Sequence, residues 1–258
     1  MNEPVVAVLG LGEAGGRLAA DLVSAGVEVR GYDPAPASTP QGVERAGDVG
    51  SAVSGASIVL ALTSAATAFA AAESALPNLR AGAIYADLNT ASPALKRDVA
   101  DLVTRSGNAR FADVALLGPI PERGLQAPVL ASGAGARTLA EVFVPLGMPV
   151  RVVSEEPGDA AAMKLVRSVF MKGLAAAVVE SMQAAEAIGR REWLTEEIEK
   201  MIGRPYLERA LEGSRRHAVR RIDEMEAARD LLLELGVEPH VANASAAQLA
   251  DLAAARER

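Results

Sequence analysis

A glycine-rich turn near the N-terminus places the strongest constraint on how this chain can fold. Residues 10–15 read Gly-Leu-Gly-Glu-Ala-Gly and follow directly after the apolar run Val5–Leu9. In this G-x-G-x-x-G pattern Gly10 permits a tight turn, Gly12 lets the backbone approach a pyrophosphate, and Gly15 allows close helix–strand packing. Amides at the start of the following helix favour the phosphate charge. The pattern predicts a dinucleotide-binding turn whose contacts come from Gly10, Leu11, Gly12, Glu13, Ala14 and Gly15.

An acidic residue ends the second apolar run, where such units contact the ribose of the cofactor. Asp33 follows Val27–Tyr32, and a carboxylate there can accept hydrogen bonds from both ribose hydroxyls. Its charge opposes a 2′-phosphate, and residues 34–42 contain no Arg or Lys to offset it. NAD is therefore expected in preference to NADP, unless Arg30 bends round from its strand. The simpler alternative for the whole pattern is a glycine-rich turn followed by an unrelated acid.

Short apolar runs alternate with stretches of helical length over the first 150 residues. Seven runs are predicted to be buried strands: Val5–Leu9, Val27–Tyr32, Ile58–Leu62, Ala83–Leu88, Phe111–Leu117, Pro128–Ser132 and Val150–Val153. Five stretches are predicted to be helices: Glu13–Ala25, Gly42–Ser54, Ala66–Leu76, Pro93–Ser106 and Ala136–Val144. Ser92 is predicted to cap the fourth helix. The alternation predicts a parallel sheet covered by helices on both faces.

The composition changes after Ser154, where Ala, Leu, Glu and Arg dominate. The longest stretch, Asp159–Gly189, is predicted as one helix that Asp159 caps and Gly189 ends. It is apolar nearly all round, so we expect it to be buried on most sides. Further helices are predicted at Glu192–Ile202, Tyr206–Leu211, Ser214–Leu235 and Val241–Ala255, separated by Gly203, Gly213 and Gly236.

The predicted fold class is a Rossmann-type α/β parallel sheet followed by an all-α C-terminal domain. The boundary separates a dinucleotide-binding domain, residues 1–153, from a helical substrate and dimerisation domain, residues 154–258. The long apolar helix needs more cover than one small domain supplies, which predicts a homodimer through the helical domain.

Composition argues against several classes of protein. The 258 residues include no Cys and only 2 His, so disulfide scaffolds are excluded and no metal site is expected. A formal net charge of −7 and an aromatic content of 3% argue against nucleic-acid binding. The N-terminus lacks the basic start of a signal peptide, and no segment is apolar enough for a membrane span. We therefore expect a soluble, cytoplasmic protein.

Polar residues after three predicted strands are candidates to contact cofactor or substrate, because ligands bind at the carboxyl ends of parallel strands. Thr63 is assigned to the cofactor, Asn89 to both cofactor and substrate, and Thr90 to the substrate. Gly118 begins a stiff Gly-Pro-Ile-Pro loop that can wall a substrate pocket. The alternatives are helix capping for the threonines and an ordinary connector for the loop.

Lys164 is the sharpest catalytic candidate because it lies in an almost wholly apolar stretch of the long helix. A lysine in dry surroundings must be paired, lowered in pKa or placed in a cavity, and each outcome suits a general acid/base. Ser168 and Lys172 share its helix face by i, i+4 spacing, and Ser168 is assigned to substrate binding. The alternative is a lysine that snorkels at a helix edge.

A basic cluster at residues 215–221 stands out in an otherwise acidic chain. Helical spacing places four polar residues on one face, away from the apolar residues nearby: His217, Arg220, Arg221 and Glu224. Such a cluster can clamp a carboxylate or phosphate, so His217 and Arg220 are candidates to bind a small anionic substrate. A solvated helix face is the simpler alternative.

Taken together, these residues resemble the β-hydroxyacid dehydrogenase superfamily, which includes 6-phosphogluconate and 3-hydroxyisobutyrate dehydrogenases. Val5–Gly15 is similar to the family's cofactor signature, and Asp87–Pro93 to its D-x-S-T-x-x-P segment. Asp113–Pro119 occupies the place of the substrate motif D-A-P-V-S-G-G, and Lys164 matches the catalytic lysine. The helical half looks most like a less characterised, phosphogluconate-dehydrogenase-like branch.

The resemblance implies hydride transfer between a nicotinamide cofactor and a small hydroxy acid, or a related alcohol or carbonyl compound, with Lys164 as general acid/base. It also implies dimers joined through the helical halves. Three positions depart from the family pattern: Leu117 replaces the substrate-binding Ser, Asn89 replaces the Ser of D-x-S-T, and Ser168 replaces the usual Asn. These departures predict an atypical substrate acid.

Two other functions stay open at this point. An imine or ketone reductase would use the same scaffold, but related imine reductases usually carry Asp or Tyr where this chain has Lys164. A dinucleotide-binding regulatory protein without turnover would fit the altered positions Asn89 and Leu117.

Overall fold

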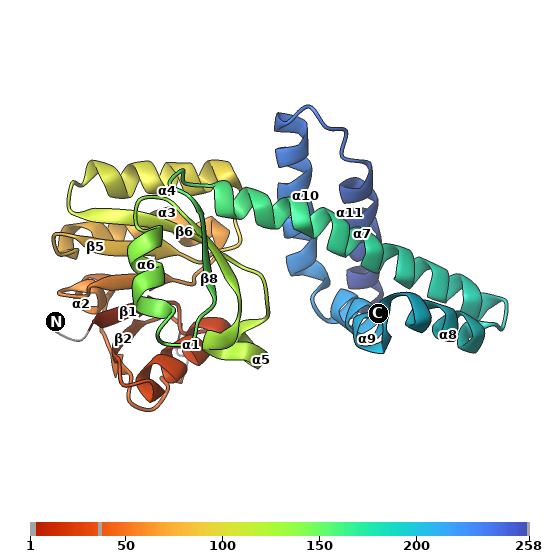
Figure 1. Cartoon of the computed structure of the whole chain (residues 1–258), viewed down its shortest axis with the longest axis horizontal. Helices are drawn as coiled ribbons and strands as arrows, with labels where there is room; N and C mark the ends of the chain where they lie inside the picture. The colour runs from red at the N-terminus through yellow and green to blue at the C-terminus, as the bar shows by residue number, and fades with distance from the viewer. Residues whose placement is uncertain (1–3, 36–37, 257–258) are drawn as a thin grey trace. The chain divides into compact units, whose positions relative to one another are not determined.

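The chain forms two compact units in the structure, a computed structural model that describes residues 4–35 and 38–256. The first unit is Met1–Lys164 and the second is Leu165–Arg258. Figure 1 shows that the first is an α/β unit and the second is wholly helical. The predicted domain boundary after residue 153 lies at the end of the last strand, whereas the units divide inside the helix that follows.

Eight strands form one sheet in the described part of the first unit. They are β1 Val5–Leu9, β2 Glu28–Tyr32, β3 Glu44–Arg45, β4 Ile58–Ala61, β5 Ala83–Asp87, β6 Ala109–Leu116, β7 Val129–Ser132 and β8 Val150–Ser154. They lie in the order β3-β2-β1-β4-β5-β6-β7-β8, and every neighbouring pair is parallel except β6–β7. The predicted Rossmann-type α/β fold followed by a helical region is confirmed.

The antiparallel pair β6–β7 departs from the wholly parallel sheet that the sequence predicts. Residues 117–128 connect the two strands and contain only α5, Ile120–Arg123, and a 3₁₀ turn. A parallel connection needs a crossover that packs on one face of the sheet, usually with a full helix. The four-residue α5 is too short for that task. β7 therefore returns alongside β6.

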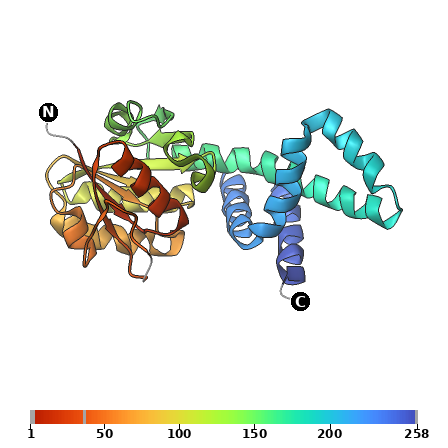
Figure 2. The same ribbon diagram turned by 90° about the horizontal axis from the view of Figure 1, so that it is seen from below.

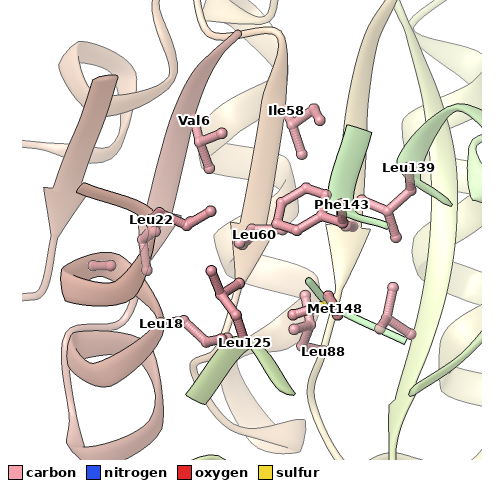
Figure 3. Close-up of a cluster of buried hydrophobic side chains, with 14 of the residues drawn as sticks. Val6, Leu18, Leu22, Ile58, Leu60, Leu88, Leu125, Leu139, Phe143 and Met148 are labelled. Atoms are coloured by element: carbon pink, nitrogen blue, oxygen red, sulfur yellow. The ribbon is translucent and has the colours of Figure 1, made fainter. Parts of the chain in front are cut away.

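Helices cover both faces of the sheet. The longer ones are α1 Glu13–Ser24, α2 Val49–Val53, α3 Ala65–Ala75, α4 Pro93–Arg105 and α6 Ala136–Phe143. Strand β1 alternates between two apolar clusters, with Val6 and Val8 in one and Ala7 and Leu9 in the other. Leu22 of α1 and Phe143 of α6 belong to the first cluster, which Figure 3 shows. Residues of α2, α3 and α4 belong to the second, so both faces are buried.

The predicted helix over residues 42–54 is wrong in its first half. Those residues begin with the short strand β3, and only Val49–Val53 is helical. The Asp48 side chain accepts a hydrogen bond from the Ser51 amide and so starts α2 there. Pairing of β3 with β2, a contact between distant residues, overrides the local pattern.

Five helices form the described part of the second unit, and the first of them begins in the α/β unit. They are α7 Asp159–Ala187, α8 Arg191–Ile202, α9 Arg204–Arg216, α10 Ala218–Glu234 and α11 His240–Arg256. Figures 1 and 2 both show α10 and α11 side by side. Val178 and Met182 of α7 pack with Leu207 of α9 in a buried apolar cluster. None of the described helices is long and apolar enough to cross a bilayer.

The predicted helix break at Gly213 is wrong, because α9 continues through it to Arg216. A Cβ on Gly213 would lie 2.4 Å from a guanidinium nitrogen of Arg221. Gly213 therefore serves close packing against the next helix, and the chain breaks at His217 instead.

Helix α7 is less buried than its apolar composition predicts. Met163, Val166 and Phe170 are 44%, 51% and 68% exposed. Within the single chain, one side of the helix is therefore not buried. The opposite side, including Leu165 and Ala175, is buried.

Candidate active site

The predicted site residues of the α/β unit gather at one edge of the sheet. Strands β1, β4, β5 and β6 are mutually parallel, so their carboxyl ends open on the same edge. Gly10, Thr63, Asn89 and Gly118 follow these four strands. Ligands of open α/β sheets bind outside this edge, so it is the candidate site.

The glycine turn has the backbone that its sequence requires. Gly10 has a φ of +94°, and its amide donates to the Tyr32 carbonyl at 2.8 Å. A Cβ on Gly10 would lie 2.3 Å from the Leu62 carbonyl oxygen, and a Cβ on Gly15 only 1.9 Å from that of Gly10. These two glycines are thus needed for the fold itself.

Gly12 has a different role from the other two glycines of the turn. It is the N-cap of α1, it is exposed, and no atom lies within 4 Å of the place where its Cβ would be. No side chain caps the amides of this helix end. Uncapped amides and open space suit a pyrophosphate, so the turn fits a dinucleotide.

Asp33 ties the end of β2 to the glycine turn. Its Oδ2 accepts from the Leu11 amide at 2.7 Å, and its Oδ1 accepts from the Ala35 amide at 2.8 Å. Arg45 of β3 donates to the carbonyl oxygens of Asp33 and Ala35 at 3.0 and 3.1 Å. Sequence reasoning missed this arginine because only the pairing of β3 with β2 brings it to the loop.

Arg30 does not bend toward Asp33. It donates to the Ser54 carbonyl at 2.6 Å and pairs with Glu28 and Glu44. These partners hold Arg30 on its strand, away from the ribose end of the turn.

Neither threonine acts as a helix cap, which corrects the capping alternative. Ser64 caps α3 in a capping box with Thr67, and Ser92 caps α4 as predicted. Thr63 and Thr90 lie just before these caps and are both exposed. Their hydroxyls lie at the edge of the sheet where a ligand would bind.

Lys164 reaches the end of β5. Its Nζ donates to Thr90 Oγ1 at 2.8 Å. The neighbouring Asn89 is 7% exposed, and both its amide and its Nδ2 donate to Asp87 Oδ1, at 2.9 and 2.7 Å. The structure thus brings together Asn89, Thr90 and Lys164, three of the predicted site residues.

A buried lysine that sequence reasoning missed lies behind this group. Lys96 of α4 is 1% exposed, and its Nζ donates to the Asp87 carbonyl oxygen at 2.7 Å. The same Nζ lies 3.3 Å from Asp87 Oδ2 and 3.3 Å from Asp113 Oδ1. Helical spacing offered a signal, since Lys96 shares the apolar face of Val99 and Val103.

Asp113 and Ser132 hold the first turn of α7. Asp113 Oδ2 accepts from the Ala161 amide at 2.9 Å and from Ser132 Oγ at 3.3 Å, and Ser132 Oγ accepts from the Ala160 amide at 3.1 Å. A carboxylate at a helix N-terminus is favoured by the helix dipole. The α7 turn that carries Lys164 is therefore anchored to β6 and β7.

A second polar cluster lies within the helical unit. Ser168 Oγ donates to Glu224 Oε1, and Lys172 Nζ lies 3.4 Å from the same oxygen. Burial lowers the pKa of Lys172, and the Glu224 carboxylate opposes that effect only in part. Burial also lowers the pKa of Arg221, which donates to Ser214 Oγ at 2.9 Å.

The face of α10 that is predicted to be polar is in fact partly buried. Glu224 is buried and Arg221 half-buried, while Arg220 is exposed and Val219 is 66% exposed. The partners of Glu224 on α7 draw this charged residue inward. His217 lies at the junction of α9 and α10.

Comparison with known proteins matches both halves of the chain. The model of the NAD-binding domain of 6-phosphogluconate dehydrogenase matches residues 5–138, and a domain of unknown function, DUF1932, matches residues 185–252. A curated protein of Methanothermus fervidus, an uncharacterized 28.5 kDa protein in the 7S RNA 5′ region, is 27% identical over 159 residues. This match covers 60% of the chain and 61% of that relative, so the chain spans about three fifths of its curated relative.

Solved structures match over almost the whole chain. A conserved protein of unknown function, described as similar to 3-hydroxyacid dehydrogenases, is 30% identical, with a TM-score of 0.75 over 98% of both chains. Mycobacterium tuberculosis 3-hydroxyisobutyrate dehydrogenase is 20% identical, with a TM-score of 0.81 over 98% of this chain and 94% of its own. A Streptomyces aurantiacus imine reductase is 18% identical, with a TM-score of 0.60 over 96% and 93%. The last two share the fold with this chain.

Gly15 is needed for packing and Gly12 is not, so their alanine variants should differ in stability. Gly15→Ala should lower the free energy of unfolding by about 3 kcal/mol, because its methyl would overlap the Gly10 carbonyl. Gly12→Ala has an ordinary backbone conformation and open space, so its stability should stay within about 1 kcal/mol of the wild type. Urea denaturation measures both values.

The same pair separates folding from binding. Gly12→Ala should weaken dinucleotide binding by about tenfold or more, since its methyl blocks the approach of the pyrophosphate. Isothermal titration of the folded variant measures this loss. Wild-type affinity in Gly12→Ala would contradict the assignment of the turn to phosphate binding.

Proposed function

We propose a function from one premise: the chain belongs to the family of the NAD-binding domain of 6-phosphogluconate dehydrogenase. Its family and structural relatives support a nicotinamide-dependent protein of hydroxyacid-dehydrogenase or imine-reductase type. We infer that it transfers hydride between NAD and a small hydroxy acid, or the matching carbonyl compound, with Lys164 as general acid/base. The observation that carries this proposal is the 2.8 Å hydrogen bond from Lys164 Nζ to Thr90 Oγ1 at the carboxyl edge of the sheet.

The chain's own residues fit a bound dinucleotide at this edge. Gly12 leaves open space, the start of α1 presents uncapped amides, and Asp33 lies beside the turn. Thr63 and Asn89 end the neighbouring strands and are proposed as further contacts. The nicotinamide, when bound, supplies the hydride chemistry that no side chain of this protein can provide.

Lys164 suits proton transfer at an alcohol oxygen because it already donates to the hydroxyl of Thr90. Its ammonium form can donate a proton to a carbonyl oxygen, and its neutral amine can accept the proton of an alcohol in the reverse direction. Thr90 and the firmly held Asn89 would orient the substrate oxygen beside the amine. This positioning matters because small displacements of reacting groups lower rates strongly.

The proposed substrate is a small anion. Its proposed contacts in the α/β unit are Asn89, Thr90 and Gly118, at the carboxyl edge of the sheet. The anion is proposed from the arginines at residues 215–221, a basic cluster of the kind that binds carboxylates, with His217 and Arg220 as candidate contacts within the helical unit. Ser168 is 1% exposed and its hydroxyl donates to Glu224, so the structure gives it a partner within the helical unit in place of the predicted substrate contact.

The central experiment replaces Lys164. Lys164→Ala should lower kcat/KM by about 10²–10⁴-fold, because the proton then lacks its acceptor, while NADH affinity stays at the wild-type value. Absorbance of NADH during a screen of small hydroxy acids measures turnover, and fluorescence titration measures binding. Lys200→Ala is the control, since Lys200 is an exposed lysine of α8.

The same screen separates the alternatives. Turnover of cyclic imines but not of hydroxy or keto acids would favour the imine reductase, whose fold this chain shares. NADH binding without turnover of any substrate would favour a regulatory protein. Full activity in Lys164→Ala would overturn the proposed role of the lysine.

We propose NAD as the preferred cofactor because Asp33 carries a negative charge at the ribose end of the turn. The guanidinium of Arg45 lies near this loop, but it already donates hydrogen bonds to two of the loop's carbonyl oxygens. It is therefore not assigned to a 2′-phosphate. Asp33→Asn should lower the ratio of NADH to NADPH affinity by about 10–100-fold, since a charged hydrogen-bond acceptor is lost and a repulsion removed. Fluorescence titration with both cofactors measures the ratio.

Glu28→Gln controls for the general loss of an acid, because Glu28 lies at the opposite end of the same strand. A wild-type protein that binds NADPH more tightly than NADH would contradict the proposed preference.

We also propose that the helical unit joins two copies of the chain. Ten exposed large hydrophobic side chains of the described part lie in this unit: Val166, Phe170, Ile188, Trp193, Met201, Val219, Leu233, Leu235, Val237 and Val241. A second copy of the helical unit would remove part of this apolar surface from water. Sedimentation velocity should give a dimer, and Phe170→Glu should shift it toward monomer. A wild-type monomer at every concentration would refute this proposal.

A further inference from the structure

We propose that Lys96 is a positioning residue for Lys164. It holds Asp87 and Asp113 together, and these two aspartates fix the two segments that meet in the Lys164–Thr90 hydrogen bond. This inference rests on the proposed function only in naming Lys164 as the group that moves the proton. All of the residues involved belong to the α/β unit.

The first step concerns the charges of the two aspartates. Asp87 and Asp113 are direct partners across β5 and β6, and they are 1% and 0% exposed. Two adjacent buried carboxylates repel each other, and a buried charge needs a partner of opposite sign. The Lys96 ammonium lies 3.3 Å from an oxygen of each, so it offsets the negative charge of the pair.

The second step follows Asp87 to the loop after β5. Its Oδ1 accepts from both the amide and the Nδ2 of Asn89, while Lys96 itself donates to the Asp87 carbonyl oxygen. Three hydrogen bonds thus fix the turn that presents Thr90. Charged acceptors make such bonds stronger than neutral ones.

The third step follows Asp113 to helix α7. Its Oδ2 accepts from the Ala161 amide, and Ser132 joins it to the Ala160 amide. Lys164 lies three residues beyond Ala161, one turn along the same helix. The charge on Asp113 therefore sets where this turn, and the lysine on it, begins.

The trio has one more negative charge than positive, and the amides at the start of α7 face the surplus. Removal of Lys96 would change both arms at once: the loop that presents Thr90 and the start of the helix that carries Lys164. If Lys96 only balanced charge in the core, its replacement would leave the environment of Lys164 unchanged. This difference can be measured.

The chain contains four lysines, Lys96, Lys164, Lys172 and Lys200, so lysine spectra are simple to assign. The experiment uses full-length protein labelled with ¹³C at lysine Cε and compares wild type, Lys96→Met and Asp113→Asn by NMR. Both variants should shift the Lys164 signal and leave that of Lys200 in place. Asp113→Asn preserves side-chain shape, so it keeps the test informative if Lys96→Met fails to fold.

Val99→Ala is the matched control. Val99 lies one turn after Lys96 on the same buried face of α4 and belongs to an apolar cluster. Its truncation leaves a cavity but no uncompensated charge. The Lys164 signal and kcat should both stay at wild-type values in this variant.

Activity provides the second readout. Lys96→Met and Asp113→Asn should lower kcat by about 10–100-fold, because the proton-transfer group is misplaced rather than removed. An unmoved Lys164 signal in both variants, or an equal shift in Val99→Ala, would overturn the positioning role. If the wild type turns over no substrate, the proposed function fails, and the NMR comparison still decides the role of Lys96.

Discussion

Compensation of buried charge between two neighbouring strands determines how the candidate active-site edge of this protein is built. Asp87 and Asp113 end up side by side in the interior of the sheet, where a carboxylate is stable only with a partner. One partner is the ammonium of Lys96, and the other is the set of amides at the start of α7. The sheet and the long helix are thus joined by electrostatics as well as by apolar contact. Removal of either partner would leave the other side with an unbalanced charge.

Features governed by local rules could be predicted from the sequence. The glycine turn, the alternation of strands and helices, and the Ser92 cap depend on neighbours a few residues away. Gly10 and Gly15 lie where a Cβ would collide with the backbone. Only glycine fits at these two positions, so their spacing in the sequence predicts the turn. For the same reason the fold class and the placement of Asn89, Thr90 and Lys164 on strand ends and helix followed from the chain alone.

Features that depend on distant partners could not be predicted. Lys96 precedes Arg97 in an amphipathic helix, and only two aspartates on other elements make a buried position stable for it. Arg45 reaches the loop after β2 because a two-residue strand pairs there. Glu224 turns inward because Ser168 and Lys172 lie opposite. In each case the position of a charged residue is determined by a partner far away in the sequence and not by its local sequence pattern.

The division of the chain inside α7 bears on how proteins of this kind diversify. The first compact unit ends at Lys164, so the amine is anchored by the same strands that form the nucleotide edge. Recombination that replaced everything after this codon would carry the amine along with the glycine turn and the buried aspartates. The helices after Lys164 could then vary in sequence while the candidate site residues of the first unit were inherited together.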